Sequence, residues 1–325
     1  MIPSAPAGKT VGPSVPAPLH PGTRDTQTIS EPCFFAVARL HLAYLWRHRR
    51  ILSLARPTRF TELVQRRKLV DRDRRLPQFI DKLMVKRFVS DRLGPEWVTP
   101  TLWSGDELPE LPPCAGLCVV KARHGCGQTE IVGPSAADWT DVRRRARSWV
   151  KNSYGRWLDE WGYRDVPRGL LIEPFVGAPP VLPIDYKLYV FHGRVEAIQV
   201  HLGRATNHRW SLFDRSWRQL SAPSPKDEIH PPATLAEMID GAEILGAGFD
   251  FVRIDFYDVG ATPRFGEMTF YPGSGLHRFN PLELDFMLGQ LWLAQPGPLR
   301  DATASVVRNE RTNNAPPMID HEHET

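Results

Sequence analysis

The chain has 325 residues, and its 42% hydrophobic and 24% charged residues are typical of a soluble globular protein. Its formal net charge of +4 is unevenly spread: residues 1–80 hold 14 Lys/Arg and 5 Asp/Glu, a net of +9, which leaves about −5 for the remainder. The composition excludes a spanning helix, because the apolar run Phe34–Trp46 has only 13 residues and contains Arg39 and His41, whereas about 20 apolar residues are needed. Residues 1–32 lack the apolar core of an ordinary signal peptide. We therefore expect a cytoplasmic protein whose basic N-terminal part is either solvated, which we favour, or in contact with an anionic membrane.

The Pro-rich stretch 1–32 is predicted to be disordered, and residues 297–325 are predicted to be a tail. Apolar spacing and helix-ending residues predict helices at Cys33–Leu54, Gln78–Leu93, Asp138–Trp157, Pro231–Leu245 and Pro281–Leu293, with a further helix beginning within Pro57–Glu62. Strands are predicted at Trp97–Trp103, Leu117–Ala122, Gln128–Val132, Gly169–Val176, Asp185–Phe191 and Arg194–Leu202. We expect Trp149 and Trp157 to pack inward, and the charges between Asp81 and Arg87 to form a solvated helix face.

The most informative stretch is Phe251–Gly275, which predicts two strands around a turn centred on Ala261. That register places Asp255 opposite Glu267 and Arg253 opposite Thr269. Facing Cβ atoms on one side of a sheet lie about 5 Å apart. Two carboxylates this close repel by about 4 kcal/mol at an effective dielectric constant near 20. The repulsion can be offset by a proton, by Arg253 or by a divalent cation such as magnesium with a nucleotide phosphate. A plain ion-pair ladder on a surface hairpin is the alternative.

A second stretch, the buried strand that ends in Lys121 and the turn His124–Gly127, forms a hairpin and not the strand–turn–helix of a dinucleotide site. The spacing of a Walker A loop is absent as well. Such a turn can lie over phosphates through its backbone N–H groups, or it can be a simple tight turn. His201 and His208 lack a third metal ligand at matching spacing. The four cysteines are expected to be free thiols, since they form neither a CxxC pair nor a cluster with histidines.

Taken in order, these features resemble the TupA-like branch of the ATP-grasp superfamily, which is associated with cell-surface polysaccharide and teichuronopeptide synthesis. The resemblance covers roughly 57–292. The stretches that carry it are Pro57–Glu62, Asp81–Lys82, Val120–Lys121, His124–Gly127, Ile172–Val176, Asp185–Lys187, Thr206–His208, Gly248–Asp255 and Gly266–Gly275.

The resemblance implies an α+β ATP-grasp fold: two lobes with antiparallel sheets enclose a nucleotide cleft, and an N-terminal helical extension precedes them. It divides the chain into a disordered arm (1–32), a basic helical segment (33–76), an N-lobe (77–176), a C-lobe with the metal site (177–296) and a tail (297–325).

The resemblance also implies two cofactors, ATP and Mg²⁺, and a role for each site residue. ATP would be bound by the phosphate-facing Lys82 and Lys121, by His124, Gly125 and Gly127 of the turn, and by Glu173, Phe175 and Val176 beside adenine. Mg²⁺ would be held by Asp255, Glu267 and Thr269. Catalysis would involve Arg253, Lys187 and the backbone around Gly273.

Some positions depart from the wider superfamily. Thr269 stands where many members have a metal-binding Asn, which puts a second metal ion in doubt. Cys126 replaces a serine, and no acidic residue between Glu173 and Asp185 is available for the ribose hydroxyls.

The implied activity is a carboxylate–amine ligase that forms an amide through an acyl phosphate. Its partners would be ATP and a carboxylate-bearing glycan or amino-acid substrate, without nucleic acid. Arg204, Asn207 and His208 are candidates for the acceptor site. A sugar or glycan kinase on the same fold, or a non-catalytic nucleotide-binding protein, remains an alternative, because a fold alone does not choose among them.

Overall fold

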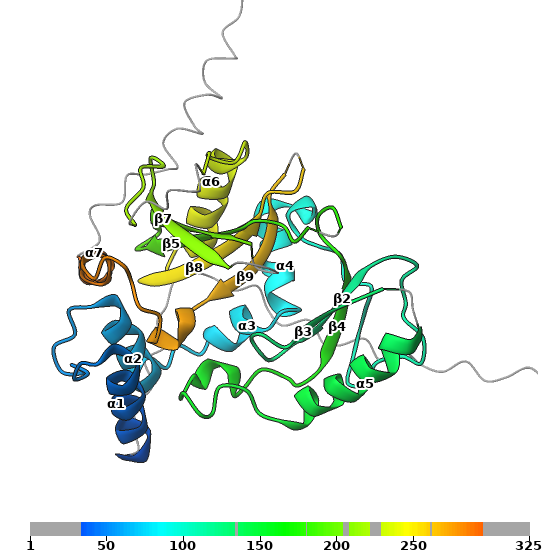
Figure 1. Ribbon diagram of the computed structural model, residues 1–325, viewed down its shortest axis with the longest axis horizontal. Helices are drawn as coiled ribbons and strands as arrows, with labels where there is room; N and C mark the ends of the chain where they lie inside the picture. Colours follow the sequence, from blue (N-terminus) through cyan, green and yellow to red (C-terminus); the bar gives the residue numbers. More distant parts are fainter. Residues whose placement is uncertain are drawn as a thin grey trace, which may run out of the picture.

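The computed structural model describes residues 34–133, 136–179, 181–203, 208–221, 229–260 and 262–294. The predicted disordered arm and tail lie outside the described residues, as do Cys33, Ala261 and two of the acceptor candidates, Arg204 and Asn207. The described chain forms two antiparallel sheets with helices around them (Figure 1).

The smaller sheet has four strands in the order β1-β4-β2-β3. Their bounds are β1 Trp103–Gly105, β2 Cys118–Ala122, β3 Thr129–Val132 and β4 Leu170–Pro174. Helix α5 (Ala136–Lys151) packs against β2 and β3, and its buried Trp139 joins Val120 and Ile172 in one apolar core. The chain alternates buried and half-buried residues along β2, which leaves Lys121 on the face opposite that core.

The larger sheet has five strands in the order β7-β6-β5-β8-β9. Their bounds are β5 Asp185–Phe191, β6 Arg194–Leu202, β7 Arg209–Asp214, β8 Phe251–Tyr257 and β9 Arg264–Thr269. Helix α6 (Leu235–Gly246) packs against β5, β6 and β8. Every residue of the central strand β5 is buried, so both faces of the sheet are covered at that strand.

The other helices occupy the N-terminal part and the end of the described chain. They are α1 Phe34–His48, α2 Phe60–Val70, α3 Leu76–Ile80, α4 Met84–Leu93 and α7 Glu283–Leu293, with 3-10 turns η1 Pro95–Trp97, η2 Trp161–Tyr163 and η3 Pro272–Gly275. In Figure 1, α3 and α4 lie between the two sheets, whereas α1 and α2 lie beside the larger one. Contacts of α3 and α4 with β9 agree with this placement.

The aromatic side chain of Phe60 anchors α2 on the larger sheet. Its ring is buried and lies 5.0 Å from that of Phe251, 5.6 Å from that of Tyr189 and 5.5 Å from that of Trp292 on α7. Tyr189 and Phe251 belong to the same face of the sheet as Lys187 and Asp255, because residues two apart on a strand point the same way. One end of this face is therefore apolar and closed by helices, and the other end is polar.

Several predicted elements differ from the structure. The single helix predicted at Gln78–Leu93 is two helices, because Asp81 is extended and its carboxylate accepts the N–H of Leu83 (2.9 Å). The strand predicted at Trp97–Trp103 is wrong, since only Trp103 belongs to a strand. The first helix ends at His48, and α6 begins at Leu235.

Two further expectations are wrong. Helix α5 ends at Lys151, so Trp157 lies beyond it and is 75% exposed, not packed inward. Cys114 and Cys118 are joined as a disulfide, not free, while Cys126 is a free thiol as expected. No helix among the described residues has the length and apolar character needed to cross a membrane.

We predict that Phe60→Ala lowers the free energy of unfolding by about 3–5 kcal/mol, because it leaves a cavity where α2, α7 and the sheet meet. Urea unfolding followed by circular dichroism measures the change. Leu111→Ala is the matched control, because this side chain is 71% exposed and should change stability by about 0.5 kcal/mol or less. Equal losses in the two variants would contradict the prediction.

Candidate active site

A row of charged side chains crosses three strands of the larger sheet. Strand pairing sets Lys187 of β5 opposite Asp255 of β8, and Asp255 opposite Glu267 of β9. Arg253 lies opposite Thr269 in the neighbouring pair. The predicted register of this hairpin is therefore confirmed at both pairs. The register shifts just after Asp255 at a β-bulge, so the symmetric pairing does not continue towards the turn.

The carboxylate of Asp255 is the centre of this row. It accepts hydrogen bonds from Arg253 Nε (2.7 Å) and Nη2 (2.7 Å), and from Lys187 Nζ (2.5 Å). Burial alone would raise the pKa of Asp255, but Arg253 and Lys187 lower it to about 2. Asp255 is therefore ionised at neutral pH, and the ion pairs fix the positions of both cations. Lys187 also pairs with Asp185 at 2.7 Å.

Glu267 is the more accessible carboxylate. Its side chain is 34% exposed, whereas that of Asp255 is 3% exposed. Its Oε1 accepts hydrogen bonds from Thr269 Oγ1 (3.0 Å) and Arg253 Nη2 (3.2 Å). Glu267 thus joins the buried row to the solvent-accessible side of the sheet.

The donor set of this row fits Mg²⁺. Two carboxylates and a hydroxyl are hard oxygen ligands, and Mg²⁺ in nucleotide sites commonly takes one or two carboxylates together with phosphate and water oxygens. Within the described ranges there is no group of three His, Cys, Asp or Glu that could hold a metal ion by itself. Phosphate oxygens would have to complete the shell.

The smaller sheet contributes a second charged cluster around Glu173 of β4. Lys121 Nζ of β2 lies 2.5 Å from Glu173 Oε2, and Lys86 of α4 pairs with Glu173 Oε1. Burial would raise the pKa of Glu173, but Lys121 and Lys86 lower it. Lys86 was expected on a solvated helix face and is instead held here, where Nζ also donates to Thr99 O (2.8 Å) and Thr101 Oγ1 (2.8 Å).

Lys82 lies where α3 meets α4 and reaches the glycine turn. Asp81, which separates α3 from α4, is buried and forms an ion pair with Arg123 (Nε–Oδ1 2.7 Å). The expected solvated helix face is therefore wrong for Asp81 too. Lys82 Nζ donates to Gly125 O. Burial lowers the pKa of Lys82, and the negative charge of Glu267 raises it. The glycine turn, Lys82 and the β9 carboxylate are therefore neighbours, although they come from three separate parts of the sequence.

Some of the other residues predicted to contact the nucleotide already use their polar groups in hydrogen bonds within the protein. The ring of His124 is buried, with Nε2 3.1 Å from Trp149 O and Nδ1 accepting the N–H of Gly169 (3.4 Å). The N–H of Phe175 donates to Leu117 O (3.0 Å), so this group is not available to read a base edge. Val176 follows β4 and is half-buried, and Gly127 has a positive φ of 71°, which suits a tight turn.

The segment around Gly273 is held by side chains of α2, a contact that was not predicted from the sequence. Gly273 and Ser274 have left-handed backbone angles (φ 50° and 56°), and a Cβ on Gly273 would lie 2.6 Å from the ring of His277. From α2, Lys68 Nζ donates to Ser274 O (2.8 Å) and Ser274 Oγ (2.6 Å). Gln65 Nε2 also donates to Ser274 O (2.8 Å). These bonds fix a strained turn four residues after Thr269.

His201 and His208 are in contact, with Nδ1 of His201 2.9 Å from Nε2 of His208. Burial, and then the charges of Lys187 and Arg253, lower the pKa of His201 to about 2. His201 is therefore neutral and lies on the strand beside Asp185, close to the charged row.

Comparison with known proteins places the chain in a family. The model of the TupA-like ATPgrasp family matches residues 62–293. A comparison with curated proteins found no match.

Solved structures of several ligases resemble the chain distantly. D-alanine–D-alanine ligase from Bacillus anthracis complexed with ATP is 15% identical, covering 72% of this chain and 68% of that one, with a TM-score of 0.43. The corresponding enzyme from Helicobacter pylori is 14% identical, covering 67% and 61%, with a TM-score of 0.39. The ATP-grasp ligase PsnB, complexed with a phosphomimetic variant of minimal precursor, Mg and ADP, is 13% identical, covering 71% and 66%, with a TM-score of 0.36.

The fold therefore belongs to the ATP-grasp class. The chain belongs to its TupA-like family, since the family model spans well over half of the sequence. The solved structures are too distant in sequence identity and TM-score to support this assignment. It rests on the family model and on the chain's own two-sheet fold. The α+β ATP-grasp fold expected from the sequence is confirmed.

We predict that Lys68 makes stability depend on pH in the alkaline range. Burial lowers its pKa from 10.5 to about 8, so between these values the unfolded chain binds a proton that the native protein does not. The free energy of unfolding should therefore rise with pH across this window. Urea unfolding at pH 8 and pH 10 should show a larger rise for the wild type than for Lys68→Met. The same rise in both proteins would show that Lys68 is not its source.

Proposed function

We propose that this protein is an ATP- and Mg²⁺-dependent ligase that joins a carboxylate to an amine and modifies a cell-surface polysaccharide or its precursor. The observation that carries the proposal is the row Lys187–Asp255–Glu267 with Arg253, next to Lys82 and the glycine turn. Membership of the TupA-like ATP-grasp family supports ATP as one substrate, and the resemblance of the sequence motifs to that family supports a glycan as the other.

In this proposal the two charged clusters bind the nucleotide between them. Lys82 and Lys121 face the phosphates, and the backbone of Gly125–Gly127 covers them. The base lies against the end of β4 near Val176. Asp255, Glu267 and Thr269 hold the magnesium ion, which when bound neutralises phosphate charge and orients the transferred group. Lys187 keeps Asp255 in place and adds positive charge.

The reaction needs positioning and charge neutralisation more than a nucleophilic side chain. A substrate carboxylate oxygen attacks the γ-phosphorus of ATP, the bond to the β-phosphate oxygen breaks, and ADP leaves. Arg253, held rigid by Asp255, stabilises negative charge on the transferred group. An amine then attacks the carbonyl carbon of the acyl phosphate and loses a proton, inorganic phosphate leaves, and an amide remains. In this proposal the backbone around Gly273 supports the tetrahedral stage.

We also propose a peripheral membrane contact, which the exposed apolar side of α1 supports. Its packed side carries Leu40 and Tyr44, whereas Phe35 (73% exposed), Leu42 (67%) and Trp46 (70%) form an apolar opposite side. The sequence from residue 34 to residue 61 contains six arginines and no acidic residue. An apolar side with flanking cations is typical of a helix that lies in an anionic lipid surface. The protein would then act at the cytoplasmic surface of the membrane.

The decisive measurement for the activity is trapping of an acyl phosphate. With ATP, Mg²⁺, candidate acids and hydroxylamine, the wild type should release a hydroxamate and ADP. Glu267→Gln should reduce both by about a hundredfold or more, because it removes a negatively charged ligand of the proposed magnesium site, and that ion would neutralise phosphate charge in the transition state. Its fold should be retained, since Glu267 is partly exposed.

Glu196→Gln is the matched control, because this carboxylate lies on the same sheet and, among the residues that the structure describes, forms its ion pair with Arg194 at 2.6 Å. Wild-type activity in Glu267→Gln would remove this residue from the metal site. A stable phosphorylated sugar without any hydroxamate would favour the kinase.

We expect the wild type to sediment with vesicles that contain phosphatidylglycerol and not with pure phosphatidylcholine vesicles, since arginines flank the apolar side. Leu42→Ser combined with Trp46→Ser should abolish sedimentation, and Leu102→Ser combined with Leu111→Ser, both exposed elsewhere, should not. If the wild type is a dimer without vesicles and the first double variant is a monomer, the apolar side is instead an interface between two copies.

A further inference from the structure

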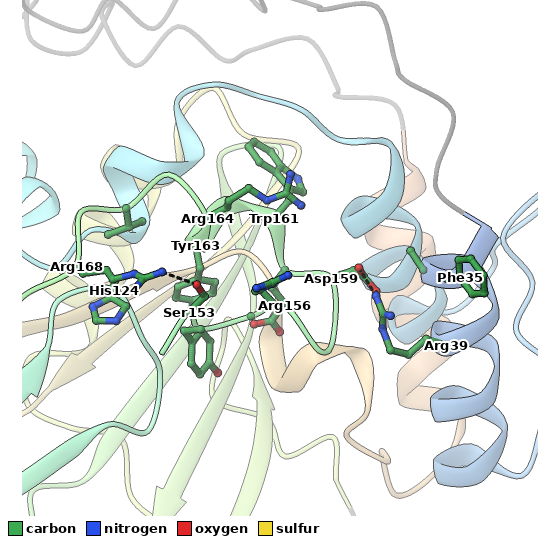
Figure 2. Close-up of a pocket in the computed structure, with 15 residues that line it drawn as sticks. Phe35, Arg39, His124, Ser153, Arg156, Asp159, Trp161, Tyr163, Arg164 and Arg168 are labelled. Carbon is green, nitrogen blue, oxygen red and sulfur yellow. Dashed lines mark hydrogen bonds and ion pairs between the residues drawn. The ribbon is translucent and has the colours of Figure 1, made fainter. Parts of the chain in front are cut away.

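A cavity of about 610 Å³ lies between α1 and the segment that joins α5 to β4 (Figure 2). Phe35 and Arg39 line it from α1, and most of the remaining wall comes from residues 153–168. Arg39 also ties the two parts together, since its Nη2 lies 2.6 Å from Oδ1 of Asp159. No residue of the segment 153–168 was assigned a binding role from the sequence, and the proposed nucleotide site does not use it.

Both acids in the wall of this cavity already have partners. The lining contains four arginines and two acids. One acid, Asp159, is paired with Arg39. The other, Glu160, is buried, and burial raises its pKa, although the charge of Lys68 and a hydrogen bond with Ser274 act in the opposite direction. Neither acid is therefore left to neutralise the other arginines of the wall.

Two of these arginines lack a carboxylate partner. Among the residues that the structure describes, Arg156 and Arg164 form no ion pair. A further cation lies next to the wall, because the guanidinium of Arg72 lies 5.4 Å from the ring centroid of Trp161, which lines the cavity. Burial lowers the pKa of Arg72, and the positive charge of Arg164 acts in the same direction. Cations that repel one another in this way favour an anion between them.

Exposed aromatic side chains border the same cavity. Phe35 belongs to the exposed apolar side of α1, together with Leu42 and Trp46, and it also lines the cavity. On the other wall Trp157 is exposed, and the guanidinium of Arg39 lies 5.9 Å from its ring centroid. The apolar side of α1 therefore continues to the edge of the cavity, where exposed rings and unpaired arginines meet.

This combination matches an anionic phospholipid, which carries a phosphate directly beside apolar chains. Arginine binds phosphate oxygens through paired N–H donors. Aromatic side chains are enriched at the level where lipid headgroups meet the acyl chains. The volume lies within the roughly 300–1,000 Å³ of small-ligand sites, so it can take a headgroup. A free anion such as inorganic phosphate would use the arginines and leave the aromatic border without a role.

We propose that this cavity binds the phosphate headgroup of an anionic phospholipid, with Arg156 and Arg164 on the phosphate and with Phe35 and Trp157 against the acyl chains. The inference rests on the membrane contact proposed for α1 and goes beyond it, because it assigns a defined lipid site in place of a general attraction to an anionic surface. A lipid bound there contacts both α1 and the segment 153–168, which are far apart in the sequence.

Calorimetry with the full-length protein tests the site, with dihexanoyl phosphatidylglycerol as a probe that dissolves as single molecules. Dihexanoyl phosphatidylcholine has the same chains and a zwitterionic headgroup, and inorganic phosphate has no chains. We expect the phosphatidylglycerol probe to bind at least about tenfold more tightly than either, because choline brings a cation towards the arginines and inorganic phosphate buries no apolar surface. Equal affinity for the phosphatidylcholine probe or for inorganic phosphate would overturn the lipid site.

Single substitutions locate the binding. Arg156→Gln and Arg164→Gln should each weaken binding of the phosphatidylglycerol probe by about tenfold, as expected for the loss of one charged hydrogen-bond donor. Arg144→Gln is the matched control, because it removes the same charge from an exposed arginine of α5 outside the cavity. An equal loss in Arg144→Gln would overturn the inference. Phe35→Ser should weaken binding of the phosphatidylglycerol probe and leave the affinity for inorganic phosphate unchanged.

Vesicle sedimentation separates the lipid site from the membrane contact on which it rests. Arg156→Gln combined with Arg164→Gln should sediment less with phosphatidylglycerol vesicles than Arg87→Gln combined with Arg144→Gln, which removes two exposed arginines elsewhere. Equal sedimentation of the two double variants would leave the contact at α1 and remove the lipid site. Binding of the soluble probe without any sedimentation of the wild type would keep the site and remove the contact. The hydroxamate assay contains no lipid, so the proposed ligase activity stands or fails separately.

Discussion

The ion pairs of Asp255 with Arg253 and Lys187 are the constraint on which the rest of the site depends. A lone carboxylate in a sheet covered on both faces would be protonated or would destabilise the fold, since burial strongly disfavours its charge. Two cations on the same and the neighbouring strand reverse this effect. The charged row can therefore exist inside the sheet, and Glu267, one strand further out, is left accessible.

The sequence predicted this row because pairing within a hairpin follows from a turn position and from the two-residue period of strands. It did not predict the bulge after Asp255, which depends on how β8 and β9 twist together. Nor did it predict the partners of Lys86, whose helix spacing looks solvated although the residue faces β4. Local patterns indicate which side chains share a face. They do not indicate what a different part of the chain places against that face, and this limit applies to Lys86.

The N-terminal helices are part of the site and not an appendage to it. Lys68 and Gln65 of α2 hold Ser274, and His48 Nε2 of α1 lies 3.1 Å from Gly275 O. The left-handed turn at Gly273 is strained, so it persists only where surrounding groups fix it. Helix α1 therefore carries the exposed apolar side and, through His48, also lies against the segment next to the charged row.

The two sheets stabilise a buried carboxylate in the same way. In each, a buried carboxylate on a strand holds two cations: Glu173 holds Lys121 and Lys86, and Asp255 holds Lys187 and Arg253. Long cationic side chains lose much rotamer freedom when they are fixed against a ligand. Here the carboxylates have already fixed them, so phosphate oxygens would meet oriented donors, and less entropy is lost when the nucleotide binds. Each carboxylate therefore controls two cations at once, which makes Glu173 as important to the smaller sheet as Asp255 is to the larger one.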